Sequence, residues 1–182
     1  MQVGAPAPPT LGTLVTAQFL HGSSVHLFFN MLFLLVFGPE IEVLTGWARF
    51  IAFYLSCGIL GGLADVSVMP GSHVPEIGAS GAIAGVLGAY IVRFPTRGLE
   101  TIGPLRGLPP FFRLPAFLVI GLWAGAQCVH GFGLLSERVL SEQGGGIAYF
   151  AHIGGFLAGL FTISLFARGG GARGGRPHRY YY

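Results

Sequence analysis

Apolar residues form five long runs along the chain, separated by short polar or Gly/Pro-rich stretches. A helix needs about 20 predominantly apolar residues to cross the hydrocarbon core of a bilayer, so each run is a candidate transmembrane helix. The expected spans cover residues 23–38, 47–64, 80–92, 114–132 and 147–167. The third is short, and we expect its neighbours to shield it from lipid. The pattern predicts an all-α, polytopic membrane helix bundle.

The composition supports a membrane protein. Hydrophobic residues make up 52% of the 182 residues and charged residues only 9%, whereas soluble domains have about 25% charged residues. The 31 glycines suit helices whose backbones pack closely in lipid. Cys57 and Cys128 lie inside apolar runs without metal-ligand spacing, so we expect free core thiols and no disulfide.

The arginines predict the orientation, because cytoplasmic loops of membrane proteins carry the excess of basic residues. All the basic residues are arginine. With five spans, one side holds Arg49, Arg93, Arg97, Arg106, Arg113, Arg168, Arg173, Arg176 and Arg179. The other side holds only Arg138, together with Asp65, Glu76, Glu137 and Glu142. We therefore expect a cytoplasmic C-terminus, an outer N-terminus and a multi-pass protein of the plasma membrane.

Outside the spans, residues 1–20 start Pro-rich and predict an extended lead-in to a membrane domain over residues 21–167. The connection over residues 95–115 contains five prolines and predicts a loop with at most a short turn. Residues 168–182 form an Arg/Gly-rich segment that we expect to be a disordered, solvated cytoplasmic tail. Such tracts can also bind RNA or anionic lipid, but we expect no nucleic-acid partner.

Polar side chains within the spans are the candidates for chemistry, since polar groups in a bilayer are costly and usually face the protein interior. His26 and Asn30 lie about 40° apart on one helix face. Ser80 opens the third span, and His152 lies near the start of the fifth. In the predicted topology all four residues share the outer half of the membrane. Structural roles alone would not require a shared depth.

Glycines predict which helices meet. Gly81, Gly85 and Gly88 form a small-residue strip beside Ser80, and Gly155 and Gly159 follow His152 at helical spacing. Small-xxx-small faces let helix backbones approach closely. Packing of the third span against the fifth would bring Ser80 Oγ within reach of the His152 ring.

This arrangement predicts nucleophilic catalysis. His152 would take the proton of Ser80, whose oxygen attacks a peptide carbonyl to give an acyl-enzyme that water hydrolyses. His26, Asn30 and the Ser80 backbone N–H are the donors available to the oxyanion. Asp65 is the only aspartate and a conceivable third member, although a charge at a helix end explains it better. Each feature has a structural alternative: a helix-start serine as a cap, a buried histidine as an interhelical bond, the glycines as packing.

Four segments together resemble the rhomboid family of intramembrane serine proteases. The segment from His21 to Asn30 is similar to the family's His-x4-His-x3-Asn segment, and residues 37–42 to the stretch that ends that helix. Residues 78–81, which include Gly78, match the Gly-x-Ser-Gly motif of the nucleophile, and residues 151–155 with Gly159 match the segment of the base. The resemblance implies a Ser80–His152 dyad without aspartate, an oxyanion site at His26 and Asn30, and no metal or cofactor. It also implies transmembrane protein substrates cut in or near a membrane-spanning segment.

The chain departs from the family pattern in two places. The family core has six helices, and the helix before the His-x-x-x-Asn helix is missing together with the loop after it, which predicts an N-terminal truncation or a five-span variant. Ala84 stands where the family often has an aromatic residue packed on the catalytic imidazole, and Tyr149 or Phe150 are the expected substitutes. Two other functions stay open: a non-proteolytic rhomboid-like protein that binds transmembrane helices without cutting them, and a small transporter or channel. An inactive truncated fragment is a further alternative. The spans lack the acidic residues expected of a transporter.

Overall fold

The computed structural model describes residues 10–70, 77–102, 111–140 and 148–168. Within these ranges the chain is mostly helical, which confirms the predicted helical bundle. The elements, in chain order, are α1 (Leu11–Thr16), η1 (Ala17–Phe19), α2 (Ser24–Thr45), α3 (Trp47–Val68), α4 (Ser80–Arg93), β1 (Gly98–Ile102), β2 (Phe111–Pro115), α5 (Ala116–Leu140) and α6 (Tyr149–Phe166). The Pro-rich start and the Arg/Gly-rich tail lie outside the described residues.

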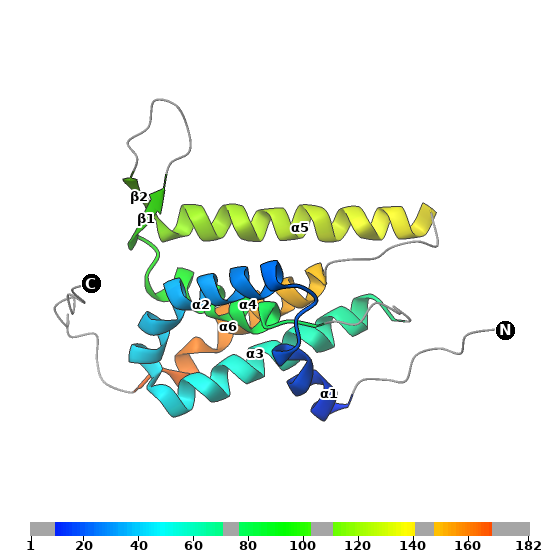
Figure 1. Cartoon of the computed structure of the whole chain (residues 1–182), viewed down its shortest axis with the longest axis horizontal. Helices are drawn as coiled ribbons and strands as arrows, with labels where there is room; N and C mark the ends of the chain where they lie inside the picture. Colours follow the sequence, from blue (N-terminus) through cyan, green and yellow to red (C-terminus); the bar gives the residue numbers. More distant parts are fainter. Residues whose placement is uncertain (1–9, 71–76, 103–110, 141–147, 169–182) are drawn as a thin grey trace.

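Helix α4 lies at the centre of the bundle, with α2, α3 and α6 around it and α5 running along one side (Figure 1). Every residue from Gly81 to Tyr90 is buried, as expected for a helix that is apolar on all faces. Around the C-terminal half of α4, side chains of the other helices complete one hydrophobic core. This core consists of Phe37, Ile41, Phe53, Cys57, Val86, Leu87, Ala89, Tyr90, Ala116, Ile120 and Ile163.

Among the described residues, four helices are long and apolar enough to cross a membrane: α2, α3, α5 over Ala116–Gly133, and α6. The 22 residues of α2 correspond to about 33 Å, which matches the hydrocarbon thickness of about 30 Å. The fifth expected span, α4, has only 14 residues and is about 21 Å long. Enclosure of residues 81–90 by the other helices explains how so short a helix is accommodated.

Helix α2 is longer than the sequence predicted. We expected the first span to end at Gly38, but the helix continues through Pro39 to Thr45. A proline removes one backbone hydrogen bond of a helix, yet burial of Phe37 and Ile41 on either side holds the helix together. The turn into α3 is a single residue, Gly46, whose φ of 83° favours glycine.

The Pro-rich connection is not a plain loop, so that prediction is wrong. Strands β1 and β2 form an antiparallel pair in which Gly98 faces Pro115 and Glu100 faces Arg113. The Arg113 guanidinium lies 2.8 Å from the Glu100 carboxylate across the strands, and such opposite-charge pairs favour one register. Pro115 is tolerated because it ends its strand.

Residues before α2 are also ordered in a way that the sequence did not predict. Thr10 caps the short helix α1 and Thr13 reaches back to it, which forms a capping box. Buried Gln18 donates a hydrogen bond from Nε2 to the Leu14 carbonyl over 3.0 Å and packs on Gly58 of α3. The α1–η1 segment is therefore anchored on α3.

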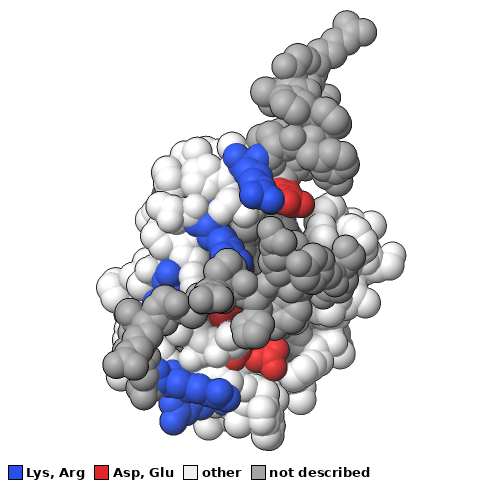
Figure 2. Space-filling view, turned by 90° about the vertical axis from the view of Figure 1, so that its left-hand side faces the viewer, with Lys and Arg blue, Asp and Glu red and all other residues white. Residues whose placement is uncertain are grey.

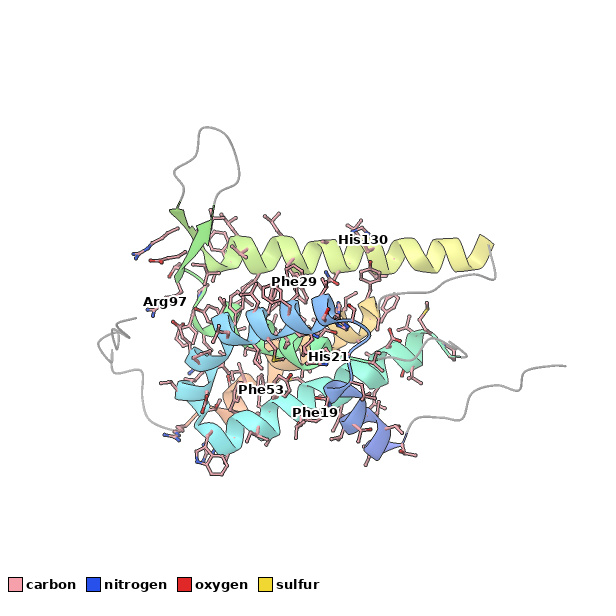
Figure 3. The ribbon with its side chains drawn as sticks, viewed as in Figure 1. Phe19, His21, Phe29, Phe53, Arg97 and His130 are labelled. Carbon is pink, nitrogen blue, oxygen red and sulfur yellow. The ribbon has the colours of Figure 1, made fainter. Side chains whose placement is uncertain are left out.

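Arginine and acidic side chains lie together on the end of the bundle that faces the viewer in Figure 2, whereas Asp65 lies in the last turn of α3, away from this end. Arg97 pairs with Glu40 at 2.8 Å, and Arg168 donates from Nε to the Thr45 carbonyl over 3.1 Å. Figure 3 shows Arg97 at this end, whereas His21 lies well away from it. The arginine end and the histidine-containing part of the bundle are thus separated along the helices.

Candidate active site

Ser80 is the first residue of α4, and Gly78, two residues earlier, sets the backbone conformation of the segment that leads into the helix. Gly78 has a φ of 125°, a conformation that residues with a side chain rarely adopt. Its N–H donates to the Ala17 carbonyl over 2.9 Å, which ties the segment before Ser80 to η1. A Cβ at Gly78 would lie only 2.7 Å from Cε1 of His26. Glycine is therefore needed here both for the backbone conformation and for space.

His152 lies in the first turn of α6, at the same end of the bundle as Ser80. The distance between His152 Nε2 and Ser80 Oγ is 2.7 Å, which is the length of a good hydrogen bond. A serine hydroxyl held in this way can lose its proton to the imidazole as the oxygen attacks a carbonyl. The two residues that the sequence selected, 72 positions apart, meet in the structure.

Glycine contacts between α4 and α6 set the relative position of these two residues. A Cβ at Gly155 would strike the Gly81 carbonyl oxygen, and one at Gly159 would strike the Gly85 carbonyl oxygen. The two helices therefore touch through their backbones, without intervening side chains. Gly88 continues the contact at the Phe156 carbonyl. The spacing of Ser80 and His152 follows from this backbone contact.

Helix α2 brings His26 and Asn30 to the segment before Ser80. The position of a Cβ at Gly78 would be 2.9 Å from His26 Nε2 and 3.6 Å from Asn30 Nδ2. Asn30 is buried, and its Nδ2 makes no hydrogen bond with any described residue. The His26 ring packs edge-on against His21, with centroids 5.3 Å apart. Two nitrogen atoms able to donate hydrogen bonds are thus gathered at this point.

The surroundings of the His152 ring differ from the expectation. Nδ1 lies 2.7 Å from Oε1 of Gln127, which comes from α5. Asp65, the conceivable third member of a catalytic triad, lies in the last turn of α3. The side chain that contacts Nδ1 is that of Gln127. A polar amide inside an apolar span is the signal that could have identified Gln127 from the sequence.

Aromatic packing on His152 also comes partly from α5. Trp123 lies one helical turn before Gln127, and its ring centroid is 6.0 Å from that of His152, with an interplanar angle of 36°. Tyr149, one of the two expected substitutes for an aromatic at Ala84, approaches edge-on at 6.4 Å. Phe150, the other, packs on Phe132 instead. Trp123 was missed because nothing local shows which helix its ring will face.

The described residues contain no group of three or more His, Cys, Asp or Glu side chains that could hold a metal ion. The expectation that the chain needs no metal or cofactor stays a prediction. Cys57 and Cys128 are free thiols, as predicted, but only Cys57 is buried in the core, whereas Cys128 is half-buried.

Fold and site together define a polytopic helical membrane protein with a serine hydrogen-bonded to a histidine inside its bundle. Comparison with known proteins gives the family: the Rhomboid domain matches residues 8–169, and the chain belongs to the rhomboid family. It is accordingly an integral membrane protein.

Similar proteins in the family include both proteases and proteins without activity. The rhomboid-family protein YdcA of Bacillus subtilis is 38% identical over 131 residues, which cover 70% of this chain and 64% of YdcA. The rhomboid protease GluP of Bacillus subtilis is 34% identical over 83% of this chain and 25% of its own length. Inactive rhomboid protein 1 of Rattus norvegicus is 32% identical over 87% of this chain and 16% of its own length. The chain thus spans less than two thirds of each of these relatives.

Proposed function

We propose that this protein is an intramembrane serine endopeptidase that cuts membrane-protein substrates in or near a transmembrane segment. The observation that supports this function best is the 2.7 Å distance between Ser80 Oγ and His152 Nε2. A structural hydrogen bond would need only a donor and an acceptor. Here the serine also lies at a helix start, near the candidate oxyanion donors His26 and Asn30. Hydrolysis of a peptide bond uses such donors to stabilise the oxyanion that forms.

In the proposed reaction, Ser80 Oγ attacks the scissile carbonyl carbon while its proton passes to His152 Nε2. The resulting oxyanion accepts hydrogen bonds from the Ser80 backbone N–H and from the side chains of His26 and Asn30. Collapse of the tetrahedral intermediate breaks the C–N bond, and His152 returns the proton to the leaving amine. Water then repeats the sequence on the acyl-enzyme, with His152 as the base. All the groups needed belong to α2, α4 and α6.

The orientation belongs to the same proposal. Arg49, Arg97 and Arg168 make their contacts at the end formed by the α2–α3 turn, the hairpin and the end of α6. By the preference for arginine on the cytoplasmic side, this end faces the cytoplasm and the site opens toward the outer half of the plasma membrane. Single-cysteine labelling from either side of intact cells tests this, after Cys57 and Cys128 are replaced by alanine. We expect protection of residue 67 from cytoplasmic reagents and labelling of residue 97, and the opposite result would reverse the topology.

The competing function is a non-proteolytic protein that holds transmembrane helices, as the similarity to Inactive rhomboid protein 1 allows. A serine-directed fluorophosphonate probe and a transmembrane reporter substrate in proteoliposomes distinguish the two. We expect the probe to label Ser80 and the reporter to be cleaved, with both lost in Ser80→Ala. Ser67→Ala is the matched control, because Ser67 also lies in a span but donates its hydroxyl to the Leu63 carbonyl of its own helix. Cleavage that survives Ser80→Ala would refute the protease assignment.

A further inference from the structure

The two ring nitrogens of His152 have different partners. Nε2 faces Ser80 Oγ, and Nδ1 faces Gln127 Oε1, each at 2.7 Å. A neutral imidazole carries one proton, so one nitrogen donates a hydrogen bond and the other accepts one. An amide oxygen only accepts hydrogen bonds. With Oε1 of the Gln127 amide assigned to the side facing the ring, the contact requires the proton on Nδ1 and leaves the lone pair of Nε2 directed at the serine.

This tautomer matters because a neutral histidine in water favours the proton on Nε2. A proton there would block the nitrogen that has to accept the serine proton. We propose that Gln127 is a positioning residue that fixes the Nδ1–H tautomer of His152, the state a general base at Ser80 needs. The consequence for catalysis rests on the proposed protease function, whereas the tautomer itself does not.

The positions of the protons at each step of the reaction are consistent with this role. When the Ser80 proton moves to Nε2, the ring becomes an imidazolium that still donates from Nδ1 to Gln127. When Nε2 gives its proton to the leaving amine, the original tautomer returns. Gln127 gains and loses no proton at any step, so it acts only through the orientation and tautomer of the ring.

An amide suits this position better than a carboxylate. A carboxylate at Gln127 would add a charge within a membrane-spanning helix, which is costly. It would also favour the protonated ring, which cannot act as a base. Trp123 lies one turn earlier on the same face of α5 and packs on the ring at 6.0 Å. Helix α5 thus holds the imidazole by its edge and by its face, while α4 supplies the serine.

The first experiment reads the tautomer directly. Nitrogen-15 NMR of protein labelled at histidine distinguishes Nδ1–H from Nε2–H, and a His152→Ala sample identifies the signal. We expect the Nδ1–H form in the native protein and a majority of Nε2–H in Gln127→Leu. A native Nε2–H form, or an unchanged Nδ1–H form in Gln127→Leu, would overturn the inference. Val129→Ala is the control, since Val129 is an exposed residue of the same helix.

The second experiment measures turnover of the transmembrane reporter. Gln127→Leu should lower kcat about tenfold with KM unchanged, because one net hydrogen bond is worth about that factor. Gln127→Glu keeps the acceptor, so it should retain the Nδ1–H form and move the acidic limb of the kcat/KM profile to higher pH. A purely structural Gln127 would instead show in Gln127→Leu as a lower thermal midpoint with kcat per folded molecule unchanged. If the native protein cleaves no substrate and Ser80 is not labelled, the protease proposal fails, and the NMR result still decides the role of Gln127.

Discussion

The contact between α4 and α6 and the contact between α5 and α6 are built in opposite ways. At the first, Gly81 and Gly85 expose backbone carbonyls that any side chain on Gly155 or Gly159 would strike. On α5, Gly131 is the glycine that faces α6, and a Cβ added there would meet side chains only, the nearest being Tyr149 Cβ at 3.3 Å. A Cβ added at Gly121, Gly125 or Gly133 would meet nothing within 4 Å among the described residues. Helix α5 reaches His152 with two long side chains instead.

This difference separates two properties of the site. Backbone contact sets the separation of the Ser80 and His152 backbones, which side-chain rotation cannot change. The orientation of the imidazole depends on Gln127 and Trp123, whose helix is packed less closely. Substitutions at the first contact should therefore remove the folded site, whereas those at the second should leave the fold and change the rate.

The largest effect is expected from Gly155→Ala. The new methyl group would collide with the Gly81 carbonyl, and a backbone atom cannot rotate away as a side chain can. Overpacking of a core costs about 1–3 kcal/mol and occasionally more, so the thermal midpoint should fall and probe labelling of Ser80 should be lost. Differential scanning fluorimetry and fluorophosphonate labelling measure the two.

Gly125→Ala is the control for that substitution. It adds the same methyl group to α5, where nothing lies within 4 Å, and alanine is favoured over glycine in helices by about 0.8–1.0 kcal/mol. Its midpoint should be unchanged or higher, with full labelling. Equal destabilisation by both substitutions would show that the two contacts do not differ.

A smaller effect on stability but a large one on rate is expected from Asn30→Ala. Removing one oxyanion donor usually lowers kcat by about 10²–10³. The Nδ2 atom of Asn30 makes no hydrogen bond with the described residues, so its removal sacrifices none of their bonds and the melting curve should be preserved. Turnover per folded molecule is the measurement, with Met31→Ala on the exposed face of α2 as the control. A destabilised protein with normal turnover would make Asn30 a packing residue.

The smallest effect is expected from Trp123→Leu. A cation over an aromatic face is stabilised by about 0.5–2 kcal/mol, so loss of the indole beside the imidazolium should lower kcat about tenfold or less with little change in the midpoint. Leu122→Ala serves as the neighbouring control, because Leu122 is exposed. An unchanged kcat in Trp123→Leu would mean that α5 acts on His152 through Gln127 alone.

The sequence by itself determined the helices and the candidate residues. Hydropathy located the membrane-spanning segments, because crossing a bilayer requires long apolar runs. The depth of Ser80 and His152 followed from their places at the starts of two spans. The glycine strips predicted that these spans would meet, since close backbone approach needs small residues at helical spacing.

Only the tertiary structure decided how α5 is rotated and therefore that Gln127 and Trp123 reach His152. Helical periodicity shows that these two residues share a face, but it does not show which helix that face meets. The same limit applies to the continuation of α2 through Pro39 and to the pairing of Glu100 with Arg113. Each depends on contacts between segments distant in sequence, and such contacts can override local preferences at a proline or in a loop.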